Sequence, residues 1–146
     1  MISMIFIFDQ NGNLLPGIHL ATWEEIEEYL AYNKRRQNLL SGLKQGCEIL
    51  KQCGCQRIYI GGSFVTTKRL PEDFDICWED DNVDFKLLKE LDPVLHPSSR
   101  RSAQKNKYGG EFLIANINIE DPFTTCLEFF QQDRNGNIKG IVALDL

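Results

Sequence analysis

The order of hydrophobic and polar residues in the first third of the chain predicts a hairpin followed by two helices. Residues 5–15 form two apolar runs separated by an Asn-Gly pair, which is the strongest local signal for a β-hairpin. Thr22 and Glu25 have the spacing of a capping box, so we expect a helix to begin near Trp23. A second helix is expected over residues 34–52, where apolar side chains recur at three- and four-residue steps. That apolar face consists of Leu39, Leu43, the pair Gly46 and Cys47, and Leu50.

The middle of the chain predicts two strands separated by a tight turn. Residues 57–60 are short, β-branched and aromatic, and they end at a Gly-Gly-Ser turn after which a short helix is expected. A second strand is expected over residues 74–78. A charged helix with apolar positions in residues 85–91 should follow, ended by Pro93 or by Pro97. The element order is therefore helix, strand, turn, strand, helix.

The last third of the chain is expected to be rich in β-structure. Residues 98–110 are polar and basic, which is typical of a surface loop, and residues 111–119 have a strand pattern. A closing strand is expected over residues 138–146, joined to what precedes it by an Asn-Gly turn. We therefore predict a single α+β domain over residues 1–146, with β-hairpins at both ends.

Composition narrows the class of protein. The chain has 146 residues, of which 42% are hydrophobic and 25% charged, so it is long enough for one core and is not a disordered chain. The net charge of -5 argues against strong nucleic-acid or anionic-membrane binding. The apolar start lacks basic residues before it and is too short for a signal peptide or a membrane span. The 5 cysteines, an odd number, favour reduced thiols, so a cytoplasmic location is expected.

One stretch of the sequence has a pattern suited to chemistry. Gly61, Gly62 and Ser63 end the first predicted strand, and nine residues later Asp73 and Asp75 flank the start of the second. Carboxylates two apart on a strand project to the same face, where they can share a divalent cation. The glycines remove side chains where backbone must approach a ligand, and the following N–H groups and hydroxyl can bind phosphate. The sequence therefore predicts that phosphate and metal meet here.

These residues resemble the nucleotidyltransferase superfamily that includes DNA polymerase beta, whose signature is a strand, Gly-Ser, nine to thirteen residues, and Asp-x-Asp. The wider chain also looks like a short bacterial family of unknown activity assigned to that superfamily. That second resemblance rests on residues 16–25, 62–78, 107–111 and 129–146. The resemblance implies a small mixed sheet with helices mainly on one face. It also implies two Mg²⁺ ions and transfer of a nucleoside monophosphate from a nucleoside triphosphate to an acceptor hydroxyl.

The resemblance also assigns roles to individual residues. Asp73 and Asp75 would be catalytic and would bind the metal ions. Glu111, at the start of the next predicted strand, is favoured as the third acid, with Glu120 and Asp121 as alternatives. The residues expected to bind the nucleotide are Gly61, Gly62, Ser63, Thr66 and Lys68. The chain departs from the minimal enzymes after Ser63, where it lacks their Ala-Arg-Gly segment. Basic side chains that can compensate are Lys68, Arg69, Arg100, Arg101, Lys105 and Lys107.

Two hypotheses of different class follow. In the first, the domain transfers a nucleoside monophosphate to a separate protein or RNA acceptor, because a chain this short has no appended acceptor-binding domain. Analogy with other minimal members places such a protein in a toxin–antitoxin or phage-defence pair. In the second, the domain is a catalytically inactive module that keeps the fold in order to bind a partner protein.

Overall fold

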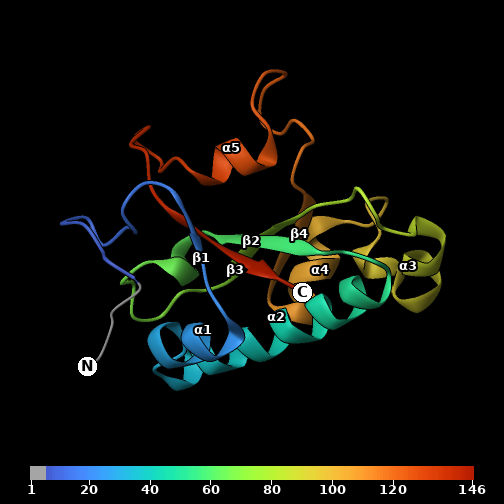
Figure 1. Ribbon diagram of the computed structural model, residues 1–146, viewed down its shortest axis with the longest axis horizontal. Coiled ribbons are helices and arrows are strands. Elements are labelled where there is room, and N and C mark those ends of the chain that lie inside the picture. Colours follow the sequence, from blue (N-terminus) through green and yellow to red (C-terminus); the bar gives the residue numbers. More distant parts are fainter. Residues whose placement is uncertain (1–5) are drawn as a thin grey trace.

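The computed structural model describes residues 6–146 as a five-stranded mixed sheet with helices on both faces (Figure 1). The strands are β1 (Ile18–Leu20), β2 (Arg57–Gly61), β3 (Phe74–Trp78), β4 (Gly110–Ile114) and β5 (Ile141–Asp145). The helices are α1 (Trp23–Leu30), α2 (Lys34–Gln52), α3 (Phe85–Leu91), α4 (Arg101–Tyr108) and α5 (Cys126–Phe130). Two single 3₁₀ turns, η1 (Ser63–Val65) and η2 (Pro93–Leu95), complete the elements. The predicted α+β class is confirmed.

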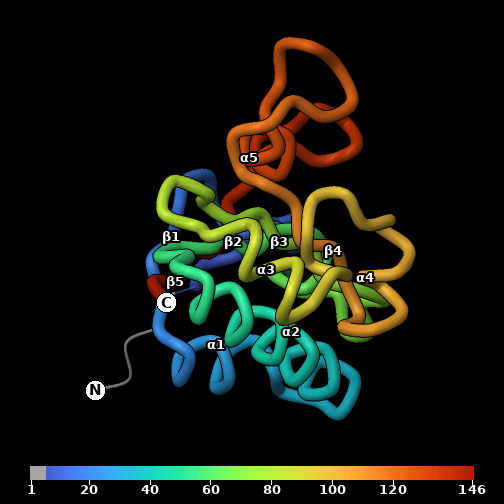
Figure 2. The backbone as a smooth tube through the Cα atoms, turned by 90° about the vertical axis from the view of Figure 1, so that its right-hand side faces the viewer, coloured from blue at the N-terminus to red at the C-terminus, as the bar shows by residue number. Residues whose placement is uncertain are grey.

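The sheet has the strand order β1-β5-β2-β3-β4. The pairs β1/β5 and β3/β4 are parallel, whereas β2 is antiparallel to both of its neighbours. Helices α1, α2, α3 and α4 lie on one face and cover the main core, while α5 lies on the other face (Figures 1 and 2). The expectation of helices mainly on one face is therefore confirmed. The second face carries a smaller core between α5 and the sheet, built from residues such as Tyr59, Cys77, Cys126 and Phe130.

The first two helices begin where the sequence predicted. The Thr22 hydroxyl accepts a hydrogen bond from the Glu25 amide (3.2 Å), and the Glu25 carboxylate accepts one from the Thr22 amide (3.0 Å), which completes the capping box. Asn33 caps α2 by accepting from the Arg36 amide (2.9 Å). Leu39, Leu43, Cys47 and Leu50 are all buried, so the predicted apolar face of α2 is also confirmed.

Helix α2 approaches the sheet closely because two of its inward positions are glycines. A Cβ atom added at Gly42 would lie 1.8 Å from the Tyr108 carbonyl oxygen at the end of α4. One added at Gly46 would lie 2.4 Å from the ring of Phe112 on β4. The two glycines thus let α2 contact both the end of α4 and the edge strand that follows it.

The predicted loop over residues 98–110 is wrong, because this segment contains α4. The buried residues of this helix are Gln104 and Tyr108. The sequence therefore lacks the row of apolar residues at helical spacing from which an amphipathic helix is predicted. Tertiary hydrogen bonds stabilise it instead. The Gln104 amide donates to the Val94 carbonyl and its oxygen accepts from the Phe112 amide, while Tyr108 and Lys107 both donate to the buried carboxylate of Asp92.

The predicted strand over residues 111–119 is longer than the observed β4, which ends at Ile114. The chain turns after Ala115, whose carbonyl accepts a hydrogen bond from the Leu127 amide at the start of α5. Helix α5 was not predicted, although Thr125 and Glu128 form a second capping box, whose spacing is a sequence signal for the start of a helix. The second half of the predicted strand is therefore a turn that hydrogen-bonds to the start of a short helix.

The ends of the chain contain less β-structure than predicted. Within the described residues the first hairpin is reduced to one bridge between Phe8 and Leu14, and the last to one between Gln132 and Ile138. The first residue of the predicted opening hairpin, Ile5, lies outside the described range. The three-residue strand β1, which was not predicted, pairs with β5 directly after Pro16 and Gly17. The closing strand begins at Ile141, later than predicted.

Two expectations drawn from composition can be compared with the fold. All five cysteines are free and buried, in agreement with the expectation of unpaired thiols. None of the helices in residues 6–146 combines the length and the apolar character needed to cross a bilayer.

The close approach of α2 to α4 generates a stability prediction. Gly42→Ala should lower the free energy of unfolding by about 2 kcal/mol, because the added methyl group meets backbone that cannot rotate away. Ser41→Ala, at the exposed neighbouring position of the same helix, should leave stability within about 0.5 kcal/mol of the parent. Urea denaturation measures both. Equal midpoints for the two variants would show that the contact with Tyr108 is not a constraint.

Candidate functional site

The two aspartates of the Asp-x-Asp motif lie at the start of β3. Asp75 pairs across the sheet with Gly61 on β2 and with Glu111 on β4. Phe74, between the aspartates, is fully buried in the main core. Because side chains alternate along a strand, Asp73 and Asp75 project to the opposite face, the one that carries α5.

The two glycines of the Gly-Gly pair have different roles. Gly62 has φ +72°, and a Cβ atom there would lie 2.3 Å from Oδ2 of Asp75, so the missing side chain is what admits this carboxylate. Gly61 instead packs beneath α5, since its Cβ would lie 3.1 Å from the Phe130 side chain. The structure therefore brings Asp75 against the turn at Gly62, whereas Gly61 serves packing.

A cavity of about 800 Å³ opens beside this contact. Six of the residues predicted for the site line it, namely Gly62, Ser63, Thr66, Lys68, Asp73 and Asp75. Gly61 and Glu111, which were also predicted, are not part of its lining. Glu72, next to Asp73, also lines the cavity, and the remaining walls come from segments far away in sequence: Asn13, Phe129, Gln132, Asp133, Arg134 and Lys139.

Charge repulsion is concentrated at Asp75. Burial raises the pKa of its carboxyl group, and the negative charges of Asp73 and Glu111 raise it further, whereas Lys105 and Lys139 act in the opposite direction. The resulting pKa is about 6. A buried carboxylate close to two others is costly without a cation, which is the electrostatic setting in which a divalent ion binds favourably.

The third predicted acid, Glu111, lies next to Asp75 in the sheet but is held by helix α4. Arg101 donates to Glu111 Oε2 through both Nε (3.0 Å) and Nη2 (2.7 Å). Lys105 Nζ lies 3.2 Å from Asp73 Oδ2 and 3.7 Å from Glu111 Oε1, between the two carboxylates. The two cations therefore occupy the carboxylate oxygens that a metal ion would use at Glu111.

These contacts decide which residues fit a metal ion. Asp73 and Asp75 supply oxygen ligands that face the cavity, and the ammonium group of Lys105 marks a position where positive charge is accommodated. No group of three or more acidic, histidine or cysteine side chains in residues 6–146 is gathered for metal binding. The two aspartates thus have the oxygen ligands that Mg²⁺ prefers, while a ligand set that includes Glu111 needs Arg101 to release it, and the two Mg²⁺ ions implied by the resemblance stay a prediction.

The alternative acids lie elsewhere. Glu120 and Asp121 are in the segment that precedes α5, and neither lines the cavity. The Asp121 carboxylate accepts hydrogen bonds from the Phe123 amide and the Thr124 hydroxyl, so it stabilises its own turn. Of the three candidates for the third acid, the fold brings Glu111 alone beside Asp75.

A buried arginine from α2 fixes the segment that follows the Gly-Gly-Ser turn. Arg36 is fully buried and donates to four backbone carbonyls. Its Nη1 binds the oxygens of Leu30 (3.0 Å) and Phe64 (2.6 Å), and its Nη2 binds those of Thr66 (2.6 Å) and Lys68 (2.5 Å). The guanidinium group therefore joins the end of α1 to the wall of the cavity that carries Thr66 and Lys68.

The hydroxyl of Thr66 adds two hydrogen bonds inside the segment that forms this wall. It donates to the Ser63 carbonyl (2.7 Å) and accepts from the Lys68 amide (3.2 Å). Thr66 also forms an isolated bridge with Asn13, so the turn near the N-terminus borders the same segment. These contacts order the segment from Ser63 to Lys68 without any ligand.

Three of the basic side chains named from the sequence pair with acids, whereas no ion pair of Arg69 or Arg100 occurs within residues 6–146. Arg101 and Lys105 pair with acids of the site, and Lys107 pairs with Asp92 (2.8 Å). The Arg69 carbonyl accepts from the Asn33 side chain (2.7 Å). Sequence reasoning missed Arg36, Arg134 and Lys139. An arginine at an inward position of a predicted helix is a usable signal for the first, but nothing in the sequence links the C-terminal turn to the cavity.

The arginine contacts generate one prediction. Arg36→Lys should lower the free energy of unfolding by about 3 kcal/mol, because a single ammonium group cannot reach carbonyls that a planar guanidinium binds from both ends. Arg35→Lys, at the exposed neighbouring position, should change it by less than about 0.5 kcal/mol. Thermal and urea unfolding measure the difference. Equal stability of the two variants would contradict the role given to Arg36.

The charge at Asp75 generates a second prediction. Its pKa is raised from the ordinary 3.8 to about 6, so the folded state holds this proton more tightly than the unfolded state. The stabilising contribution is full below about pH 4 and is lost as the pH rises through 6. In metal-free buffer at pH 7.5, Asp75→Asn should therefore be more stable than the parent by on the order of 2 kcal/mol.

The same comparison at pH 4.5 should give a much smaller difference between Asp75→Asn and the parent. Asp81→Asn, at an exposed position, is the control and should follow the parent at both pH values. Urea midpoints with a chelator present measure the effect. A pH-independent difference for Asp75→Asn would show that repulsion at this carboxyl group is absent.

Comparison with known proteins identifies a family but no activity. A family described as a family of unknown function (DUF6932) matches residues 6–145. No curated protein and no solved structure matches the chain. Because the match extends over nearly the whole chain, the protein belongs to this family of unknown function, DUF6932.

Proposed function

We propose that the domain transfers a nucleoside monophosphate from a nucleoside triphosphate to a hydroxyl group of a separate protein or RNA, in a Mg²⁺-dependent reaction. The observation that carries the proposal is the position of Asp75, whose carboxylate lies against Gly62 in a cavity that Ser63 and Asp73 also line. The likeness to the nucleotidyltransferase signature supports this assignment.

Each part of the cavity has a role in the proposed reaction. Asp73 and Asp75 would hold the metal ion, which neutralises phosphate charge and activates the acceptor oxygen. Ser63 and Lys68 would bind phosphate oxygens at the wall that Arg36 and Thr66 hold in place. Phe129, which is 40% exposed, offers an aromatic surface on which a base can stack.

The proposed reaction is a single displacement at phosphorus. The acceptor oxygen forms a bond to the α-phosphorus, the bond from that phosphorus to the bridging oxygen breaks, and pyrophosphate and the hydroxyl proton are released. Glu111 would become a third metal-binding acid when Arg101 releases its carboxylate. The cavity volume of about 800 Å³ is within the range of pockets that hold small-molecule ligands.

Labelled nucleotides test the proposal. The purified protein is incubated with each α-labelled nucleoside triphosphate and Mg²⁺ or Mn²⁺, with and without cell extract. The parent should label an acceptor, and Asp73→Asn and Asp75→Asn should each reduce labelling at least a hundredfold, or by about 3 kcal/mol in transition-state stabilisation. Asp81→Asn, which is exposed and outside the cavity, should retain activity.

A metal titration provides the second readout of the same proposal. Mg²⁺ should raise the thermal midpoint of the parent more than that of Asp75→Asn, because binding to the folded state alone is stabilising. If the parent labels nothing with any nucleotide and Mg²⁺ has equal effects on both proteins, the transferase assignment is wrong.

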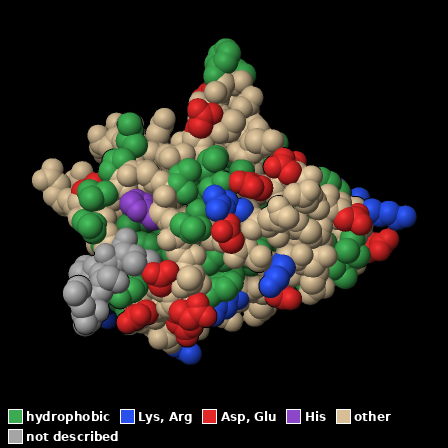
Figure 3. All heavy atoms as spheres, in the orientation of Figure 1, with side chains coloured by type: hydrophobic (Ala, Val, Ile, Leu, Met, Phe, Trp, Pro, Cys, Tyr) green, Lys and Arg blue, Asp and Glu red, His purple; other side chains and the backbone are tan. Residues whose placement is uncertain are grey.

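A specific observation favours the second candidate, a catalytically inactive module that binds a partner protein. The cations of α4 already neutralise Glu111 and Asp73 within the domain. At the tip of the segment that precedes α5, hydrophobic side chains project from the body of the molecule (Figure 3), and Phe123 there is 88% exposed. A large aromatic side chain at a projecting tip offers apolar area that a partner protein can bury. A parent that is inactive in labelling, with a stoichiometric complex that Phe123→Ser weakens, would support this candidate.

A further inference from the structure

The turn segment between α5 and β5, residues 131–140, supplies basic side chains to the cavity although it lies far from the Gly-Gly-Ser turn in sequence. Lys139 and Arg134 line the cavity together with Ser63 and Asp75. The proximity of Lys139 and Asp75 is also visible in their electrostatics, since each charge favours the charged form of the other. The C-terminal turn therefore forms the wall that faces the acids.

Lys139 differs from the other cations around the acids in having no carboxylate partner. Arg101 and Lys105 are paired with Glu111 and Asp73, whereas no ion pair or side-chain hydrogen bond of Lys139 occurs within residues 6–146. Burial lowers the pKa of Lys139, the charges of Asp75 and Asp133 act in the opposite direction, and Arg134 lowers it slightly further. Neither acid forms an ion pair with Lys139 within residues 6–146, so its ammonium group has no directly paired negative charge. An anionic ligand in the cavity would supply that charge.

The backbone around Lys139 is fixed. Its amide donates to the Gln131 carbonyl (2.9 Å), and the Gly140 amide donates to the Leu14 carbonyl (2.9 Å). A Cβ atom at Gly140 would lie 2.1 Å from the Leu15 carbonyl oxygen, so the chain is packed tightly directly after the lysine. Lys139 therefore extends from a rigid position into the cavity.

A second set of bonds orders the tip of the same segment. The Asp133 carboxylate accepts from the amides of Asn135 (2.9 Å) and Asn137 (2.9 Å) and from the Asn137 side chain (3.2 Å). This carboxylate is thus engaged within its own turn. Arg134, which follows it, is exposed at the rim of the cavity.

We propose that Lys139 binds the outer phosphates of a polyphosphate ligand in the cavity, with Arg134 at the rim. This inference rests on the proposed function and names the part of the chain that recognises the leaving group. Lys139, Arg134 and Lys68 give the cavity three basic side chains, and the segment directly after Ser63 has none before Lys68. A compact ammonium charge on a fixed backbone is suited to several phosphate oxygens at once.

Calorimetric titration with magnesium tripolyphosphate tests the inference without any nucleotide or acceptor. Lys139→Gln should weaken tripolyphosphate binding at least tenfold, and Lys139→Arg should restore most of it because the charge is kept. The loss should be smaller with inorganic phosphate, which carries less negative charge and fewer oxygens for Lys139 to bind.

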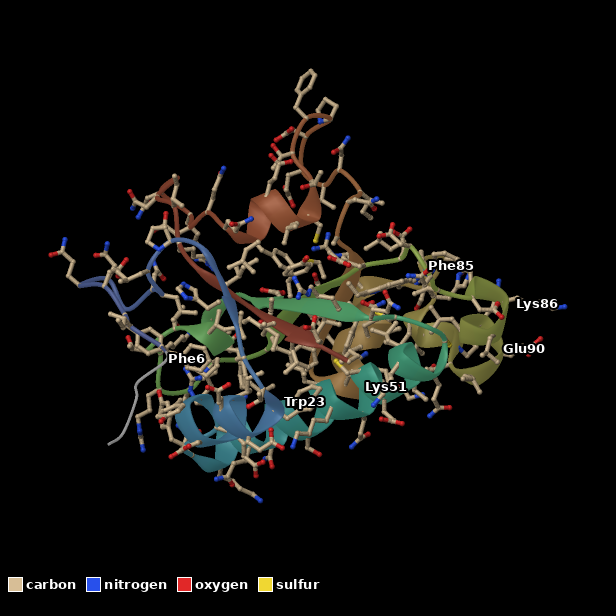
Figure 4. The ribbon with its side chains drawn as sticks, viewed as in Figure 1. Phe6, Trp23, Lys51, Phe85, Lys86 and Glu90 are labelled. Atoms are coloured by element: carbon tan, nitrogen blue, oxygen red, sulfur yellow. The ribbon has the colours of Figure 1, made fainter. Side chains whose placement is uncertain are left out.

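Lys86→Gln is the matched control. Lys86 is an exposed lysine on α3 that points away from the molecule (Figure 4), and it also lacks an ion pair within the described residues. Its loss should leave tripolyphosphate binding unchanged. Thermal unfolding of each variant confirms that the proteins compared are folded.

The outcomes separate this inference from the proposed function. Tripolyphosphate binding that depends on Lys139 supports the inference even if no acceptor is labelled, and it then describes an anion site in a protein that is not a transferase. Equal binding by Lys139→Gln and the parent overturns the inference even if nucleotide transfer is observed. Absence of tripolyphosphate binding by the parent also overturns it.

Discussion

The cavity of this protein depends on one buried guanidinium group. Arg36 is fully buried, forms no ion pair with a carboxylate within residues 6–146, and is compensated by four backbone carbonyl groups. A buried charge is costly unless it is hydrogen-bonded, and because Nε of Arg36 has no hydrogen-bond partner within residues 6–146, the stability of this charge depends on these four carbonyls. Three of them belong to residues 64–68. The segment after the Gly-Gly-Ser turn is therefore held from the interior, and its outer surface is left open to a ligand.

The second constraint is the register of the sheet. Gly61, Asp75 and Glu111 are neighbours across three adjacent strands, so the two acids lie side by side on the face that α5 covers only in part. Placing two carboxylates on adjacent strands is unfavourable, and the raised pKa of Asp75 reports that cost. Helix α4 offsets part of it through Arg101 and Lys105. Helix α4 thus neutralises part of the negative charge of the acids and also packs against the core.

The sequence predicts those parts of the fold that depend on local signals. The capping box at Thr22 and the apolar face of α2 identify the first helices, and the strand-turn-strand unit identifies where Asp75 and Gly62 approach each other. Helix α4 is missed because its inward residues are the polar Gln104 and Tyr108, whose partners are distant in sequence. The Gly-Gly pair looks uniform in the sequence, yet Gly62 admits a carboxylate and Gly61 admits Phe130. Such differences arise from tertiary packing, which no local pattern encodes.

The distribution of charge around Asp75 determines what a ligand of the proposed site must supply. The side of the cavity formed by the sheet has acids in excess and favours a cation, whereas the C-terminal turn presents Lys139, which forms no ion pair within residues 6–146, and favours an anion. A metal ion alone leaves Lys139 without a directly bound anion, and a polyphosphate alone places its charge near Asp75. Each therefore binds more favourably when the other is present, which is a positive coupling free energy between two adjacent subsites. A metal-bound polyphosphate places a cation next to the acids and an anion next to Lys139. The complex of the two should therefore bind more tightly than the metal ion or the polyphosphate alone.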